Sequence, residues 1–126
     1  MPRKRNEKYE DIYGLIFFIE MTYFYMLDKY GDIYNVSGDE DEIKKLNLNL
    51  NEVYKIEGLI FNGKDKRNYL LYRIKKKTKF IKLIDTDANI FKKYAIIRFI
   101  FLDDNTNQRS AIIKIRNQKI YIYPKK

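Results

Sequence analysis

Basic and aromatic side chains alternate near the end of the chain, and these residue types are suited to contacting nucleic acid. Tyrosine rings stack on unpaired bases, lysine and arginine contact phosphates, and each stacked base contributes about 1 to 3 kcal/mol. The candidate binding residues are Tyr94, Arg98, Lys114, Arg116, Lys119, Tyr121 and Tyr123. The competing interpretation is that exposed strands favour Tyr, Lys and Arg for packing and edge protection alone.

The spacing of the last five candidates predicts a common face on a hairpin. A two-residue turn at 117–118 sets Lys114 opposite Tyr121 and Arg116 opposite Lys119. Isoleucines occupy the alternate positions of both strands and would form the buried side. The predicted outer face is therefore basic and aromatic.

The first two candidates join this face if 93–102 is a strand. This run is apolar and rich in β-branched and aromatic residues, which is typical of a central strand covered on both faces. A five-residue loop after it pairs Phe99 with Ala111 and turns Tyr94 and Arg98 outward. All seven candidates would then share one surface.

The chain offers little catalytic chemistry. It has no cysteine and no histidine, which excludes thiol nucleophiles, thiolate metal sites and imidazole acid–base catalysis. Asp85, Asp87, Asp103 and Asp104 follow predicted strands and could hold a divalent cation, but loop aspartates usually form turns. We expect a non-enzymatic protein with no catalytic residues, no metal and no cofactor.

Charge is distributed unevenly along the 126 residues. The formal net charge is +9, with −4 in residues 1–52 and +13 in residues 53–126. A basic surface favours contact with nucleic acid and carries no information about the fold. The chain is also rich in Lys, Ile and Tyr, whose codons are A/T-rich, so genome composition explains part of the lysine excess.

The first part of the chain predicts a helix at 7–30. Asn6 is a suitable N-cap, and Gly31 is a suitable residue to end the helix. Most positions from Ile12 to Leu27 are apolar, so the predicted helix must be covered on more than one side.

This apolar helix predicts a protein interface rather than a membrane span. One small sheet covers only part of it, so we expect a homodimer or a protein partner to bury Phe17, Phe24 and Tyr25. Glu20 interrupts the apolar stretch, which is shorter than the ~20 residues that a span requires, and no signal-peptide cleavage site follows. We expect an intracellular protein with no membrane contact, and a mobile segment at 1–5.

Residues 31–51 predict an acidic connection that contains a short helix at 40–46. Asp39 and Glu42 have the spacing of a capping box at the start of this helix. From residue 53 the apolar period changes to two, which predicts an antiparallel β region over 53–123. Its expected strands form two three-stranded meanders, at 53–60, 69–75, 79–85, 93–102, 108–116 and 119–123.

The first hairpin of this region has a self-consistent predicted register. Pairing Ile60 with Leu70 puts one apolar face inward and sets Glu57 opposite Arg73, which is a favourable cross-strand charge pair.

The predicted fold is a single α+β domain in which the N-terminal helix packs on a mainly antiparallel sheet of about six strands. The sheet either lies open or closes into a small OB-like barrel, and periodicity does not choose between them. The first functional hypothesis is contact with single-stranded nucleic acid or structured RNA through the C-terminal sheet. The alternative is a structural or accessory subunit of a larger assembly, such as a virion or ribonucleoprotein particle, that docks through the apolar helix.

Overall fold

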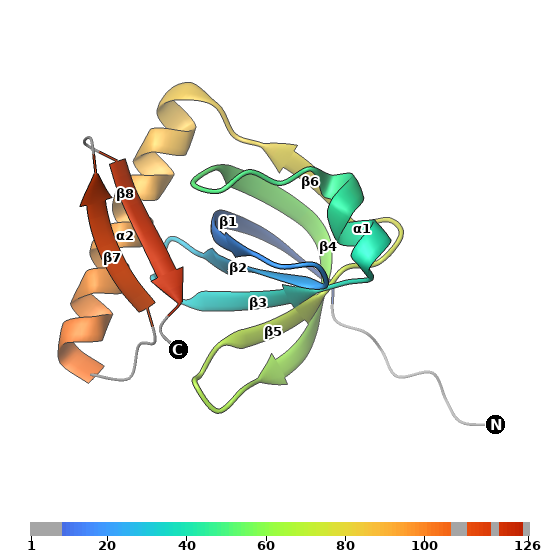
Figure 1. The fold of residues 1–126 in the computed structure, drawn as a ribbon, viewed down its shortest axis with the longest axis horizontal. Coiled ribbons are helices and arrows are strands. Elements are labelled where there is room, and N and C mark those ends of the chain that lie inside the picture. Colours follow the sequence, from blue (N-terminus) through green and yellow to red (C-terminus); the bar gives the residue numbers. More distant parts are fainter. Residues whose placement is uncertain (1–8, 107–110, 117–118, 125–126) are drawn as a thin grey trace.

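A computed structural model describes residues 9–106, 111–116 and 119–124 (Figure 1). The fold class is α+β, as the sequence predicts, and strands dominate. In chain order the elements are β1 (Tyr9–Ile19), β2 (Tyr23–Leu27), β3 (Ile33–Ser37), α1 (Glu40–Leu46), β4 (Val53–Lys64), β5 (Leu70–Arg73), β6 (Lys79–Lys82), α2 (Asp85–Thr106), β7 (Ala111–Arg116) and β8 (Lys119–Pro124).

Five strands close into a mixed barrel in the order β1-β2-β3-β5-β4, and β1 pairs with β4 to complete it. All of these pairs are antiparallel except β3 and β5, which are parallel. β1 is long enough to pair first with β4 and then with β2. Register shifts in β1 and β4 supply the local bends that closure requires. β6 extends the sheet at β4.

The inside of the barrel is an apolar core closed at one end by α1. Phe24 and Met26 of β2 and Ile56 of β4 are fully buried there. α1 inserts Ile43 into the same core, and Gly38 just before the helix lies against Ile43 and the Ile74 side chain. α1 therefore closes this end of the barrel.

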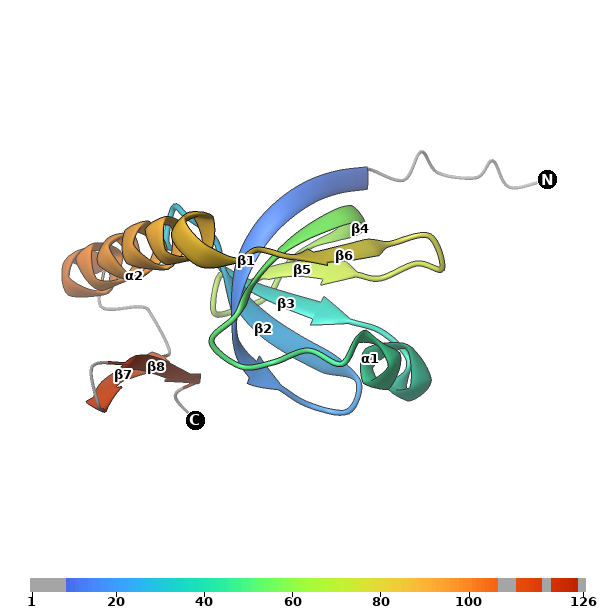
Figure 2. The ribbon, with the colours of Figure 1, turned by 90° about the horizontal axis from the view of Figure 1, so that it is seen from above.

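A second core lies outside the barrel, beneath α2. Ala95 and Phe99 of α2 pack with Leu15 of β1, Leu27 of β2 and Val53 of β4, all of them buried. Figures 1 and 2 place α2 and the β7–β8 hairpin at one end of the barrel and α1 at the other. The outward residues of β1 and β2 are thus covered by the C-terminal part of the chain.

The prediction of an N-terminal helix is wrong, because this segment forms β1 and β2. A continuous apolar run suits a helix covered all round, and it equally suits strands with a core on each side. Here the barrel core covers one face of β1 and β2, and α2 covers the other. Glu20 lies in the turn between the strands, and Gly31 lies in the β2–β3 turn.

The prediction of a central strand at 93–102 is also wrong, because this run lies within α2. The predicted pairing of Phe99 with Ala111 is lost with it, since Phe99 belongs to the core beneath the helix. Asp85 and Asp87, predicted as loop residues, lie in the first turn of α2, where acidic residues favour the helix dipole. Asp103 and Asp104 also lie within the helix rather than in a loop.

Several predicted elements are confirmed. α1 spans the predicted residues, and the Asp39 backbone N–H donates to the Glu42 carboxylate at 2.8 Å, as a capping box requires. The strands predicted from residue 53, at 69–75 and at 79–85 correspond to β4, β5 and β6.

The register of the first hairpin differs from the prediction. Ile60 lies opposite Arg73 rather than Leu70, and Glu57 lies opposite Lys79 of β6. β4 continues to Lys64, which places the turn later in the chain than predicted. The region is mainly antiparallel, with the parallel β3–β5 pair as an exception that local reasoning did not anticipate.

The described residues contain no helix that is both long and apolar enough to cross a membrane. Residues 1–8, which include the predicted mobile segment at 1–5, lie outside the described part of the chain.

Candidate nucleic-acid interface

The predicted register of the C-terminal hairpin is confirmed. Lys114 lies opposite Tyr121 and Arg116 lies opposite Lys119, in a two-stranded sheet separate from the barrel sheet. Tyr123 lies opposite Ile112. Because opposite and alternate residues of an antiparallel pair share a face, all five predicted residues lie on one face of this sheet. The predicted turn at 117–118 falls outside the described residues.

Tyr94 and Arg98 do not join that sheet, because both lie on α2. The predicted common surface of all seven residues was argued from a strand at 93–102, and that strand prediction is wrong. Tyr94 and Arg98 are four residues apart, which places them on one face of the helix, and both are exposed. They line a cleft between α2 and the barrel.

Phe17, Phe24 and Tyr25 were predicted at a protein interface, and all three are buried within the chain itself. Phe24 is inside the barrel, while Phe17 and Tyr25 lie in the core beneath α2. The reason for assigning them to an interface was the predicted helix, so that reason no longer holds.

A cluster of aromatic rings covers the outer side of the β1–β2 hairpin. β2 alternates, so that Phe24 and Met26 point into the barrel and Tyr23 and Tyr25 point outward. Phe18 of β1 stacks on Tyr25 with a centroid separation of 5.2 Å, and Tyr23 lies 5.4 Å from Tyr25. Phe18 and Tyr23 are only partly buried, so their rings remain accessible at the edge of the cluster.

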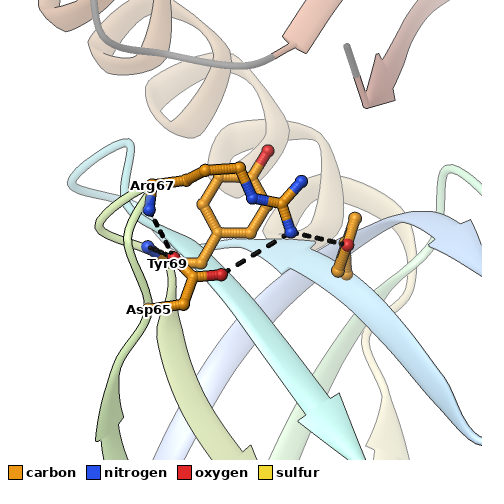
Figure 3. A network of polar contacts seen from close by, with 4 residues as sticks. Asp65, Arg67 and Tyr69 are labelled. Atoms are coloured by element: carbon orange, nitrogen blue, oxygen red, sulfur yellow. Dashed lines mark hydrogen bonds and ion pairs between the residues drawn. The ribbon is translucent and has the colours of Figure 1, made fainter. Parts of the chain in front are cut away.

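The β4–β5 loop places an arginine beside this cluster (Figure 3). The Asp65 carboxylate accepts the backbone N–H groups of Arg67 at 2.8 Å and Tyr69 at 3.0 Å, which fixes the turn. Arg67 Nη2 donates to the Tyr25 hydroxyl at 3.2 Å and lies 3.6 Å from the second Asp65 oxygen. The guanidinium carbon lies 4.4 Å from the centroid of the Tyr69 ring. Arg67 is thus held in one orientation.

The electrostatics of this arrangement keep Arg67 charged and Tyr23 neutral. The hydrogen bond to Tyr25 is the main cause that raises the pKa of Arg67, so the guanidinium stays protonated. Desolvation, and then the nearby Tyr25, raise the pKa of Tyr23, so its ring stays an uncharged phenol. We call Phe18, Tyr23, Tyr25, Arg67 and Tyr69 the arginine–aromatic surface.

This surface is available for a further anion. The two side-chain polar contacts of Arg67 with described residues both use Nη2, and the side chain is 41% exposed. A guanidinium has five N–H donors, so Nε and Nη1 can bind an oxyanion such as phosphate. The described residues contain no group of three or more acidic side chains placed to hold a metal ion.

The sequence indicated the turn that carries Arg67 but not its neighbours. The turn-forming run 62–67 predicts a loop, whereas the contact of Arg67 with Tyr25 joins residues 42 positions apart. This contact depends on β5 lying beside β3 and β3 beside β2. The sequence pattern predicted a helix over Phe18, Tyr23 and Tyr25, so it gave no signal of this cluster.

Comparisons of the chain with protein-family models, with curated proteins and with solved structures return no match.

Proposed function

We propose that this protein binds single-stranded nucleic acid, or unpaired parts of structured RNA, with little sequence preference, and that its barrel is of the OB type. The connectivity supports this type, because α1 lies between β3 and β4 and the strand order is closed by β1 and β4. OB barrels bind oligonucleotides on the face of strands 2 and 3 and on the loops that join strands 1 and 2 and strands 4 and 5.

The observation that carries the proposal is the arginine–aromatic surface. It combines the outward side of β2 with the β4–β5 loop, and it places a stacked guanidinium beside partly exposed rings. Phe18 and Tyr23 can stack bases without reading their identity, since every base has a flat face. Arg67 can contact the adjoining phosphate through its free edge.

The β7–β8 hairpin supplies further positive charge. Lys114, Arg116 and Lys119 share one face of it with Tyr121 and Tyr123. Lysine and arginine that neutralise phosphates release counterions, so the affinity should fall steeply with salt. We assign this face to contact with the phosphate backbone of the nucleic-acid strand.

The experiment is a fluorescence anisotropy titration of a labelled single strand of about twelve nucleotides, within the site size of one OB barrel. We expect Arg67→Met to weaken binding about tenfold, because it removes a phosphate contact. Lys66→Met is the matched control, since it removes the same charge from the same exposed loop without touching Tyr25 or Tyr69.

Three results would contradict or narrow the proposal. Absence of wild-type affinity at low salt would refute it. Equal losses for Arg67→Met and Lys66→Met would show that the arginine–aromatic surface makes no specific contact. If Arg67→Met weakened the binding of duplex more than the binding of single strand, the result would argue against stacking, because paired bases are not free to stack.

A second candidate function is an accessory subunit of a larger assembly that docks through an apolar helix. The observation favouring it is that α2 exposes Ile90, Ile97 and Ile100 at 50%, 54% and 42%. A second copy of the chain is the first partner to test, by sedimentation equilibrium at high salt. Under this hypothesis the wild type is dimeric even at high salt, because apolar association survives high salt. Ile97→Glu should be monomeric, because it replaces an exposed apolar side chain with a charged one. A wild type that stays monomeric at high protein concentration would refute this form of the hypothesis.

A further inference from the structure

A cleft of about 810 Å³ lies between α2 and the end of the barrel at which β2 joins β3. Its walls come from β1, the β2–β3 turn, β4 and the part of α2 from Asp87 to Arg98. This volume falls in the range of small-molecule sites. The cleft is separate from the arginine–aromatic surface, whose residues do not line it.

Three tyrosine rings line the cleft and are accessible. Tyr13, Tyr30 and Tyr94 are 43%, 61% and 59% exposed. Tyr13 also contacts Phe91 of α2 at a centroid distance of 6.3 Å, so an aromatic wall joins the barrel to the helix. Flat rings at this density favour a flat ligand.

Each tyrosine has a cation as its neighbour. Lys29 Nζ lies 5.1 Å from the Tyr30 ring, and Lys55 Nζ lies 5.9 Å from the Tyr13 ring. Arg98 lines the cleft one helical turn beyond Tyr94. The cations therefore come from the turn, the barrel and the helix, and they converge on one cleft.

Carboxylates limit how much negative charge the cleft can accept. Asp11, Asp28 and Asp87 also line it. Asp11 already accepts the Gly58 backbone N–H at 3.1 Å, and Asp28 accepts backbone N–H groups of its own turn. A polyanion that filled the whole cleft would be repelled by these carboxylates, whereas a single anionic group beside a ring can lie away from them. A ligand with one flat ring and one phosphate matches both the rings and the charges.

The turn that carries Lys29 and Tyr30 is held in place before any ligand binds. The Asp28 carboxylate accepts the backbone N–H groups of Tyr30 at 2.8 Å and Asp32 at 2.9 Å, and it also accepts the Tyr34 hydroxyl. Gly31 in the same turn lies against the α2 backbone at Arg98. The turn is therefore ordered before a ligand binds, so binding does not carry the entropic cost of ordering it.

We propose that this cleft binds one nucleotide, with its base among Tyr13, Tyr30 and Tyr94 and its phosphate on Arg98 and Lys29. The nucleotide is either free or the phosphorylated end of a nucleic-acid strand. Only the second source rests on the proposed function; binding of a free nucleotide would stand without it.

The experiment is isothermal titration calorimetry of the full chain with uridine monophosphate, uridine and inorganic phosphate. We expect the nucleotide to bind more tightly than uridine, and phosphate alone to bind least. Tyr94→Ala should weaken nucleotide binding by about 5- to 150-fold, the effect of one lost stacking contact. Tyr9→Ala is the matched control, because Tyr9 is also 59% exposed and does not line the cleft.

A second pair of variants tests the phosphate contact. Arg98→Met should lower nucleotide affinity to that of uridine, while Lys93→Met, an exposed α2 cation outside the cleft, should have no effect. Thermal melts and ¹⁵N spectra of each variant confirm folding, so that a lost affinity is not mistaken for unfolding. Equal affinities of Tyr94→Ala and Tyr9→Ala, or of Arg98→Met and Lys93→Met, would overturn the proposal.

The two sources are distinguished by a short strand with and without a 5′ phosphate. Tight binding of the phosphorylated strand with weak binding of the mononucleotide assigns the cleft to strand ends, and the reverse assigns it to free nucleotides. Arg67→Met should weaken strand binding and leave mononucleotide binding unchanged. A wild type that binds the mononucleotide but no strand would refute the proposed function and keep this inference. A wild type that binds neither mononucleotide nor phosphorylated end would overturn the inference.

Discussion

Gly31 is the point at which the β2–β3 turn meets α2, and Gly31→Ala tests whether the helix is seated there. Its φ of +86° is a conformation that costs an L-residue about 1 to 2 kcal/mol. A Cβ at this position would lie 2.7 Å from the Phe99 backbone nitrogen and 2.8 Å from the Arg98 carbonyl carbon. Backbone atoms cannot rotate away as the end of a side chain can, so the turn or the helix must shift.

We expect Gly31→Ala to lower the free energy of unfolding by about 2 to 4 kcal/mol. Overpacking adds about 1 to 3 kcal/mol to the cost of positive φ, and the stiffer unfolded chain offsets about 0.4 to 1 kcal/mol. The melting temperature should fall by roughly 4 °C per kcal/mol for a chain of this length. Urea denaturation followed by far-ultraviolet circular dichroism measures the change.

The matched control is Gly58→Ala. Gly58 has a φ of +84°, nearly the value at Gly31, but a Cβ there would meet only the Thr78 Cα at an ordinary 3.9 Å. Gly58→Ala should therefore lower the free energy of unfolding through backbone strain alone, by about 1 kcal/mol once the effect of the stiffer unfolded chain is subtracted. Equal losses of unfolding free energy in the two variants would refute the close packing of α2 on the β2–β3 turn. A selective loss at Gly31 should also weaken nucleotide binding in the cleft.

Three further predictions concern other parts of the molecule. Desolvation raises the pKa of Asp28 above its ordinary 3.8, so its contribution to stability is present below pH 3.8 and is lost as pH rises. The stability of Asp28→Asn relative to wild type should therefore increase from acid to neutral pH in urea denaturation, and a pH-independent difference would contradict this. Asp39→Ala should cost about 1 kcal/mol through loss of the α1 cap, and an unchanged melting temperature would contradict that role. Reversing Arg116 and Lys119 to Glu should lower the salt slope of single-strand binding by about 1.4, with about 0.5 kcal/mol or less of stability lost; an unchanged slope in anisotropy titrations would remove the β7–β8 face from the interface.

Local interactions made part of the fold predictable from the sequence. α1 follows from Asp39 and Glu42, whose contact spans three residues. The β7–β8 register follows from a short connection, because the loop length fixes which residues face each other. The alternation from residue 53 onward likewise identified β4, since one side of that strand faces the barrel core.

The two long apolar runs were assigned the wrong way round, helix for strands and strand for helix. Both runs satisfy helical and strand spacing at once, so periodicity does not choose between the two. The aromatic and β-branched residues between Ile12 and Leu27 favour strands, and the acidic start of α2 favours a helix. These signals are weaker than the effect of burial, which depends on the neighbours that each run meets in space.

The candidate sites depended on tertiary structure to a greater degree. The sequence determined an α+β chain with a basic second part, a capped short helix and a C-terminal hairpin whose basic and aromatic residues share a face. Tertiary structure decided the closure of β1 on β4, which pairs residues 38 to 51 positions apart, and the packing of α2 over the outer face. Arg67 meets Tyr25, and Tyr94 shares a cleft with Tyr13, only because of that closure and packing. Such contacts arise from burying apolar surface across the whole barrel, and no local pattern of residues encodes them.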